Sequence, residues 1–157
     1  MPVAADIMES WRRPRVVVRR LLARGASEPL VFSFLLAFLA LALTAASPGL
    51  ARQAWAEGGT PLMPRLYAAT LGLLATIPLW YLLAALGHLV ARAFGGMGSH
   101  NGARLALFWS LLVISPAMLV QGLLQGMAGQ AGHLPGLAVG AGFLIFWGSA
   151  LHEVERQ

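Results

Sequence analysis

Side chains able to do acid–base, nucleophilic or metal chemistry are few in this 157-residue chain, and they are widely spaced along it. The sequence has no cysteine, a single aspartate (Asp6) and four histidines, His88, His100, His133 and His152. No spacing among the histidines matches a known zinc-binding pattern, and no serine–histidine–aspartate set is available for nucleophilic catalysis. The sequence therefore predicts neither an enzyme nor a cofactor or metal site.

Two glutamines in the C-terminal half are the polar side chains whose spacing does suggest a role. Gln121 and Gln125 are four residues apart, so they share one face of a helix, and Gly122 and Gly126 follow them directly. Small residues let two membrane helices approach closely, and amide side chains bridge between helices. We expect this face to be a packing seam, either with the next helix of the chain or between two copies of it. A transport path is the alternative, although no ionisable side chain accompanies the pair as proton and ion paths normally require.

Two prolines and a glycine-rich segment complete the set of residues that could carry function. Pro78 and Pro116 lie in apolar stretches where a proline kinks a helix, and such a kink can serve either as a hinge or as a static packing feature. We favour the static kink. Residues 95–98 read Gly-Gly-Met-Gly but lack the lysine and hydroxyl residue of a phosphate-binding loop, so they do not predict a nucleotide site.

Most of these residues lie in or beside long uncharged stretches of the sequence, so the structure of those stretches determines where they are placed. Hydrophobic residues make up 58% of the chain and charged residues only 11%. No charged residue occurs in residues 29–51, 66–91 or 105–152, and a bilayer-spanning helix needs about 20 apolar residues. The sequence therefore predicts an all-α polytopic membrane protein with a four-helix transmembrane domain over residues 29–152. The four predicted spans are approximately residues 30–46, 66–91, 105–127 and 137–151, with Ser47-Pro48-Gly49 ending the first and a glycine-rich turn over 126–136 joining the last two.

Basic residues lie beside the spans, and all eleven are arginine. Residues 1–28 hold six of them and predict a cytoplasmic interfacial segment with a short basic amphipathic helix from Pro14 to Gly25, whose apolar residues include Val17, Val18 and Leu21. A solvated positive flank is the alternative. Nine arginines lie on the side of the two termini and two on the other, so we expect both termini, including the tail 153–157, in the cytoplasm.

Arginines in these positions suit anionic lipid headgroups rather than nucleic acid. The side chains expected to contact lipid or a partner are Arg15, Arg19, Arg20, Arg24, His88, Arg92 and Arg104.

Several short motifs resemble a known family. They are the run His-Leu-Val-Ala-Arg-Ala-Phe-Gly-Gly-Met-Gly at 88–98, Ala-Arg-Leu-Ala-Leu-Phe-Trp at 103–109, Ser115-Pro116, and the N-terminal Pro14-Arg15 with Arg-Arg-Leu-Leu at 19–22. Together they resemble the bacterial branch of the Yip (Ypt-interacting protein) family. The resemblance implies a small multi-span membrane protein with a cytoplasmic N-terminus.

The eukaryotic members of that family are associated with Rab-type GTPases and vesicle traffic. This chain lacks the acidic Asp-Leu and Gly-Pro pattern at the start of the eukaryotic domain, and it predicts four spans where those relatives commonly have five. That role is therefore not carried over to this chain.

The function expected from the sequence is non-enzymatic. We expect an inner-membrane scaffold or interaction protein that engages membrane lipids or another membrane protein, and that can form a homo-oligomer. The alternative is a small transporter, or a subunit of one, with a polar path between the second and third spans that uses Pro78, Pro116, Gln121 and Gln125.

Overall fold

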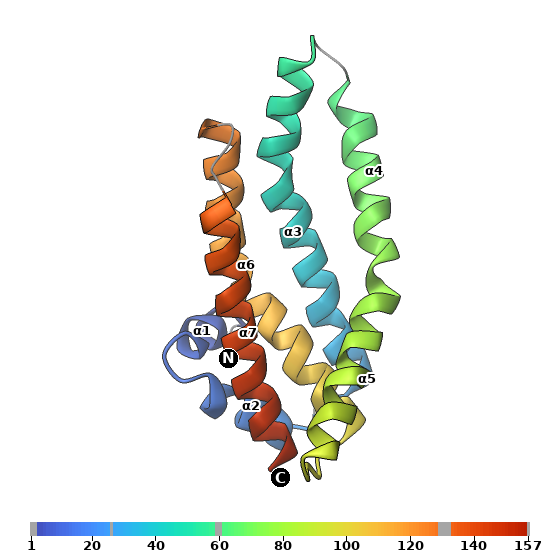
Figure 1. Ribbon diagram of the computed structural model, residues 1–157, viewed down its shortest axis with the longest axis vertical. Helices are drawn as coiled ribbons and strands as arrows, with labels where there is room; N and C mark the ends of the chain where they lie inside the picture. Colours follow the sequence, from blue (N-terminus) through green and yellow to red (C-terminus); the bar gives the residue numbers. More distant parts are fainter. Residues whose placement is uncertain (1–2, 26, 59–60, 129–132, 157) are drawn as a thin grey trace.

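The computed structural model of this chain describes residues 3–25, 27–58, 61–128 and 133–156, and the secondary structure of these residues is helical (Figure 1). In chain order the helices are α1 (Val3–Ser10), α2 (Pro14–Ala23), α3 (Glu28–Ala56), α4 (Leu62–Ala75), α5 (Ile77–Ala93), α6 (His100–Ala128) and α7 (His133–Glu155). The predicted all-α class is confirmed. Part of the turn predicted over 126–136, residues 129–132, lies outside the described residues, as does Gly59 of the loop between the first two spans.

Four stretches of helix in the described residues are long and apolar enough to cross a bilayer: Glu28–Ala56, Leu62–Ala93, His100–Met127 and Leu134–Glu155. The second consists of α4 and α5 together. Their number agrees with the sequence prediction, and the protein is a multi-pass membrane protein.

The first span is longer than predicted, because α3 does not end at Ser47-Pro48-Gly49 but continues to Ala56 with Pro48 inside it. A proline leaves the carbonyl four residues before it without a backbone donor. The Ser47 hydroxyl donates to that carbonyl, on Thr44, at 2.8 Å. Since the freed acceptor is satisfied, the helix passes through the proline, as membrane helices can.

The same arrangement recurs at Pro116, which lies inside α6. There the Ser115 hydroxyl donates at 2.7 Å to the carbonyl of Leu112, the group that Pro116 leaves unpaired. The chain thus uses the dipeptide Ser-Pro twice to carry a proline within a spanning helix.

Pro78 behaves differently, because the helix is interrupted beside it. α4 ends at Ala75 and α5 begins at Ile77, with Thr76 between them. The Thr76 hydroxyl donates to the Leu73 carbonyl at 2.6 Å and accepts the indole N–H of Trp80 at 3.0 Å. The second span is therefore two helices joined at Thr76, rather than one helix kinked in its middle.

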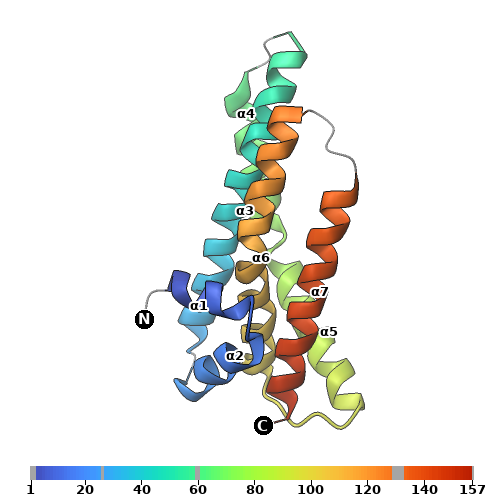
Figure 2. The same cartoon turned by 90° about the vertical axis from the view of Figure 1, so that its left-hand side faces the viewer.

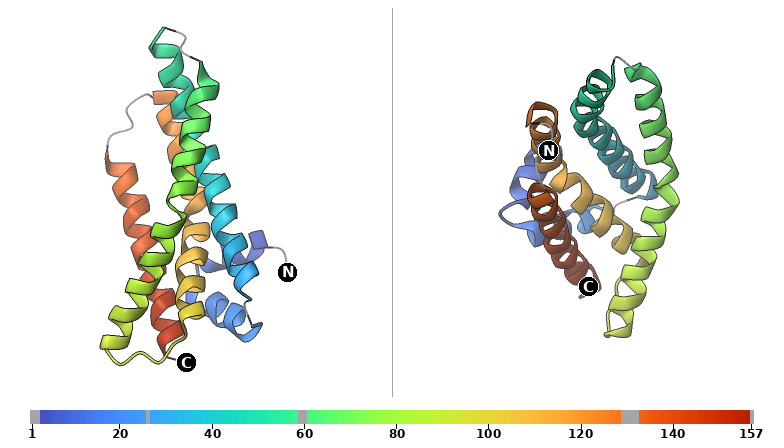
Figure 3. Two further views of the ribbon diagram at one scale, coloured as in Figure 1. Left: turned by 90° about the vertical axis from the view of Figure 1, so that its right-hand side faces the viewer. Right: turned by 45° about the horizontal axis from the view of Figure 1, so that its top comes forward.

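The core is built around the first half of α6, which packs against α3, α5, α7 and α1 (Figures 1 and 2). Among its largest fully buried side chains are Trp109, Phe108, Leu105 and, from α3, Leu35. In contrast, α4 and α5 run as a long outer element along the edge of the bundle (Figure 3). A bilayer would cover the large apolar surface that this element leaves exposed.

The N-terminal segment folds back onto the bundle as two helices, of which only α2 was predicted (Figure 2). Its apolar residues Val17, Val18 and Leu21, which we expected to face the headgroup region, are buried by protein. The reason is that α2 packs against α7, while Trp11 donates its indole N–H to the Val113 carbonyl of α6 at 3.0 Å. This segment is thus a cap on the bundle, and its apolar side is not available to lipid.

Candidate functional site

The structure gathers most of the predicted contact residues at one end of the bundle. The chain termini and the α5–α6 turn lie toward this end, while the α3–α4 connection lies at the other (Figures 1 and 2). We call it the terminal face, and define it as residues 3–25, 92–104 and 152–156.

Arg20 is held by two acids of α1. Its guanidinium donates two hydrogen bonds to the Glu9 carboxylate, at 2.9 and 3.0 Å, and one to Asp6 at 3.0 Å. The hydrogen bonds from Arg20 hold the pKa of Glu9 below its ordinary value. Arg24 approaches the same Asp6 carboxylate at 4.0 Å. These two arginines therefore hold α1 to α2, contrary to the expectation that they are free for lipid.

Arg19 and Arg104 also have partners within the protein. Arg19 pairs with Glu153 of α7 at 2.7 Å. Arg104, at the start of α6, pairs with Glu28 of α3 at 2.8 Å, and its guanidinium lies 5.1 Å from the centre of the Tyr81 ring. Both arginines connect elements of the bundle, which limits what they can offer to a ligand.

His88 is not at the surface, which corrects its assignment as a lipid contact. It is only 2% exposed, because the face of α5 that carries Ala84, Gly87 and His88 points into the bundle. Its Nδ1 lies 2.8 Å from Oε1 of the buried Glu155, and its ring meets that of His100 edge-on at 4.4 Å. This pair connects α5 to the end of α7.

The glycine-rich segment forms a cradle for that same carboxylate. Gly95 has φ +89°, a conformation that ends α5 and favours glycine. A Cβ at Gly96 would lie 2.4 Å from Oε2 of Glu155, so a larger residue there would displace the carboxylate from its position. The Gly98 N–H donates to Oε2 at 3.0 Å, and the Met97 N–H donates to the Glu155 backbone carbonyl at 3.1 Å. The segment that lacks the features of a nucleotide loop binds a side chain of the protein instead.

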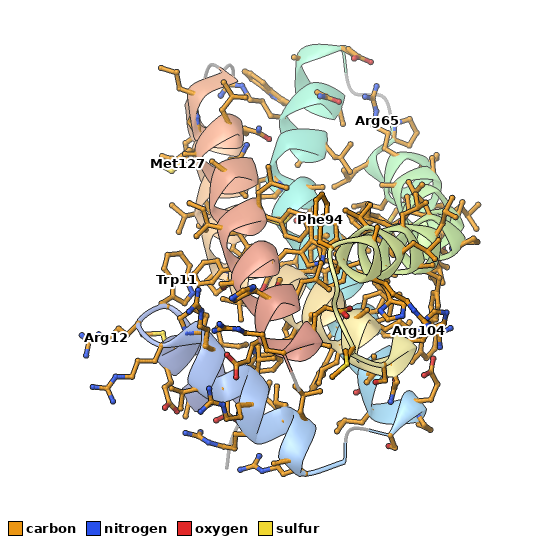
Figure 4. All side chains as sticks on the ribbon, turned by 60° about the horizontal axis from the view of Figure 1, so that its bottom comes forward. Trp11, Arg12, Arg65, Phe94, Arg104 and Met127 are labelled. Carbon is orange, nitrogen blue, oxygen red and sulfur yellow. The ribbon has the colours of Figure 1, made fainter. Side chains whose placement is uncertain are left out.

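The arginines that remain available are fewer than predicted. In the described part of the chain, five exposed arginines have side chains that make no hydrogen bond or ion pair: Arg12, Arg13, Arg15, Arg92 and Arg156. Figure 4 shows Arg12 at the outer edge of the N-terminal segment. Arg15 and Arg92 were predicted as contacts, and this part of the prediction stays open.

Arg12, Arg13 and Arg156 were missed by sequence reasoning. Each follows an acid at helical spacing, Arg12 and Arg13 after Glu9 and Arg156 after Glu153, which predicts a local ion pair. Those acids bind more distant arginines instead, as described above. No local pattern signals this exchange, because it depends on how α1, α2 and α7 meet.

At the opposite end, both arginines have partners. Arg52 donates to the carbonyls of Gly126 and Met127 at 3.2 and 2.9 Å and so satisfies the last turn of α6. Arg65 pairs with Glu57. Figure 4 places Arg65 and Met127 away from the terminal face.

The face of α6 that carries Gly122 and Gly126 packs against α3. We had expected it to pack against the next helix of the chain, which is α7, or against a second copy of the chain. A Cβ at Gly122 would come within 1.9 Å of the Ala45 carbonyl oxygen, and one at Gly126 within 2.5 Å of Pro48. α3 can approach this closely because both positions lack a side chain.

The glutamines next to those glycines face different helices. A Cβ at Gly136 of α7 would lie 3.2 Å from Nε2 of Gln121, and one at Gly49 of α3 would lie 3.9 Å from Oε1 of Gln125. Pro78 and Pro116 are exposed on the outside of the bundle. Within the described residues, the prolines and glutamines thus do not line one common path between the second and third spans.

The histidines are also separated. His88 and His100 are in contact, His152 is exposed, and the side chain of His133 lies outside the described part. Among the described residues, no group of three or more His, Cys, Asp or Glu side chains is placed to hold a metal ion.

A family model described as the Yip1 domain matches residues 8–152. The match begins within α1 and ends within α7, so it includes the first three spans and most of the fourth. No curated protein and no solved structure matches the chain.

Proposed function

This chain belongs to the Yip1 domain family, and from that premise we propose that it is a non-enzymatic membrane scaffold whose terminal face binds anionic lipid headgroups. The observation that carries the proposal is the set of exposed arginines in the described residues that make no hydrogen bond or ion pair, Arg12, Arg13, Arg15, Arg92 and Arg156. An arginine close to an anionic membrane surface contributes about 1 kcal/mol to binding. Such residues have no role in holding the bundle together, in contrast to Arg19, Arg20 and Arg104.

Exposed apolar side chains at the same end support a position of the terminal face at the level of the lipid headgroups. Phe94 and Met97, in the turn after α5, are 88% and 83% exposed. Large apolar residues beside arginines suit the boundary between headgroups and acyl chains, where each kind of side chain finds a favourable environment. The terminal face would therefore meet the headgroups of one leaflet directly.

We further propose that the terminal face is cytoplasmic and that the membrane is a bacterial inner membrane. The excess of arginine on this side supports the orientation. Its test is a reporter fused after residue 157, since an insertion in the α5–α6 turn would displace Gly98 from Glu155. A fluorescent reporter active only in the cytoplasm should fluoresce, and alkaline phosphatase at the same position should be inactive. The opposite pattern would reject the orientation.

Lipid binding is tested with two double variants that remove the same charge from opposite ends. The variant Arg15→Gln/Arg92→Gln removes two unpaired arginines of the terminal face, and Arg52→Gln/Arg65→Gln removes two paired arginines from the other end. Full-length protein is extracted from bilayers of phosphatidylcholine with a minor share of phosphatidylglycerol, and the retained lipids are quantified by mass spectrometry. We expect the first variant to lose phosphatidylglycerol enrichment about tenfold and the second to keep it.

Equal enrichment in both variants and the unmodified protein would reject the lipid-binding face. If the enrichment is equal but photocrosslinking from position 92 captures a membrane protein, the scaffold binds a protein and not a lipid surface. A nonspecific charge effect would reduce enrichment equally in the two double variants, which also counts against the proposal.

A further inference from the structure

A small pocket opens beside the terminal face, between the C-terminal ends of α5 and α7. Its volume is about 230 Å³. It is lined by Ala91, Phe94, Gly95, Gly96, Leu151, His152, Glu155 and Arg156. The contacts described above account for the glycines and for the position of Glu155, but no contact within the described part of the protein explains why Phe94, His152 and Arg156 line the same pocket.

The inner part of this pocket favours a positive charge. Glu155 contributes a carboxylate whose two oxygens each have one partner, His88 and the Gly98 N–H. An ionised carboxylate has about four acceptor positions, so it can accept a further hydrogen bond. The C-terminal ends of α5 and α7 both border the pocket, and each carries the negative end of a helix dipole. Phe94, which is 88% exposed and so lies at the rim of the pocket, adds an aromatic ring that can attract a cation.

The outer part of the pocket favours a negative charge. Arg156 and His152 line it and are both exposed. The Arg156 side chain has no hydrogen bond or ion pair with the described residues, so its donors are available. A guanidinium binds a phosphate through two parallel hydrogen bonds, which fixes the orientation of the ligand as well as its charge.

We propose that this pocket binds a phosphoethanolamine group, with the primary ammonium toward Glu155 and Phe94 and the phosphate toward Arg156 and His152. The natural source is the headgroup of an aminophospholipid in the adjacent leaflet, and a water-soluble phosphoethanolamine ester has the same chemistry. Phe94 lies at the end of α5, where the apolar span meets the terminal face (Figure 4). This inference rests on the proposed function in that both place the terminal face against lipid. It assigns a zwitterionic ligand to a defined pocket, separate from the anionic lipid held by Arg15 and Arg92.

The test uses the full-length protein in detergent with equimolar phosphatidylethanolamine and phosphatidylcholine of identical acyl chains, followed by native mass spectrometry. Phosphatidylcholine has no N–H to donate to Glu155, and hydrogen bonds between charged groups contribute about 1.5–3 kcal/mol. We therefore expect phosphatidylethanolamine to bind at least about tenfold more tightly. Phe94→Ala should reduce that preference about threefold, and Arg156→Gln should weaken the binding of both lipids.

Matched substitutions at the other end serve as controls. Trp55→Ala removes an aromatic side chain that is 82% exposed, and Arg52→Gln removes an arginine, so neither should change the preference. Phe94 and Arg156 are exposed, which is why their variants should keep the thermal stability of the unmodified protein. Soluble glycerophosphoethanolamine is then added at the lipid concentration. If it does not displace the lipid, the ligand is a membrane headgroup, and if it does, the same chemistry binds a soluble ester.

Equal binding of the two lipids would overturn the inference, as would an unchanged preference in a stably folded Phe94→Ala variant. Neither result touches the phosphatidylglycerol enrichment that depends on Arg15 and Arg92. Conversely, the Arg15→Gln/Arg92→Gln variant could keep the phosphatidylglycerol enrichment of the unmodified protein while the preference for phosphatidylethanolamine is also preserved. That result would reject the anionic lipid surface and leave the pocket proposal intact. The two proposals can therefore fail separately.

Discussion

The four spans divide into a central pair, α3 and α6, and an outer pair, α4–α5 and α7. All four are apolar enough to cross a bilayer, yet their burial within the protein differs widely. In the most apolar 18 residues of each span, 39% of α3 and 56% of α6 is buried, against 6% in each outer span. Lipid is as apolar as a protein core. The hydropathy of a helix therefore indicates that it lies in the membrane, but not whether it packs against lipid or against other helices. What distinguishes the two pairs is the presence of small residues and specific hydrogen bonds.

The central pair is joined along its length. Gly122 admits the backbone of Ala45, Trp109 is buried between α3, α1 and α6, and its indole N–H donates to Ser10 at 3.1 Å. The two outer spans are joined to each other near the terminal face, where His88 of α5 pairs with Glu155 of α7 and Glu155 accepts hydrogen bonds from the backbone of residues 97–98. This difference predicts that packing defects will be costly in the central pair and that polar defects will be costly where the outer spans are attached to each other.

The largest expected effect is the loss of the Trp109 side chain. Trp109 is 2% exposed and lies edge-on to Phe34 with a centroid distance of 5.2 Å. Trp109→Ala should lower the free energy of unfolding by about 3–5 kcal/mol, because it leaves a cavity and removes the indole N–H that the buried Ser10 hydroxyl accepts. The measurement is unfolding by SDS in mixed micelles. Leu144→Ala in α7, where the side chain is 60% exposed, is the control and should shift the value by less than about 0.5 kcal/mol. Similar losses in both variants would break the distinction between the pairs.

Glu155→Gln comes next, since it weakens the attachment of the outer spans to each other. A neutral amide keeps the size of the side chain but loses the charge-assisted bond to His88, so we expect a loss of about 1.5–3 kcal/mol. Hydrogen exchange should rise in residues 94–99 and at the end of α7, while the centre of α6 stays protected. Glu57→Gln, at an exposed carboxylate of the opposite end, is the matched control. If exchange rises uniformly through α3 and α6, the attachment is not local.

Glycine substitutions separate close packing from helix propensity. Gly122→Ala would place a methyl group against the Ala45 carbonyl, which is backbone and cannot rotate away, so the free energy of unfolding should fall by about 1–3 kcal/mol. Gly140→Ala in α7 meets nothing within 4 Å and should be neutral or stabilising by up to about 1 kcal/mol. Gly122→Ala should thus lower the midpoint of SDS unfolding, and Gly140→Ala should leave it unchanged or raise it. A loss in Gly140→Ala equal to that in Gly122→Ala would indicate that α7 has a close neighbour, such as a second copy of the chain.

The sequence predicted the number of spans and the end at which their basic residues gather, because uncharged length and arginine content are local properties. It predicted the wrong end for α3, since local rules treat Ser47-Pro48-Gly49 as a break and do not count the hydroxyl that satisfies the Thr44 carbonyl. Within the candidate site it could not separate arginines with partners from free ones. Whether Glu9 pairs with Arg12 or Arg20 is decided by how α1 folds back onto α2, which spacing does not encode.

The smallest expected effect concerns that Glu9–Arg20 pair, which joins α1 to α2 at the surface. The hydrogen bonds from Arg20 lower the pKa of Glu9 in the folded protein. A lowered folded pKa means that the stabilisation is fully present above the unfolded pKa of about 4.3 and is lost as the pH falls through the folded pKa. Unmodified protein should therefore be slightly more heat-stable than Glu9→Gln at pH 6–7, and the difference should shrink as the pH falls below about 4. Thermal unfolding of both proteins over this range measures it, and high salt should reduce it, because an exposed pair is screened. A difference that stays constant however far the pH is lowered would show that Glu9 acts through packing, which would make the cap part of the central core and not a surface attachment to it.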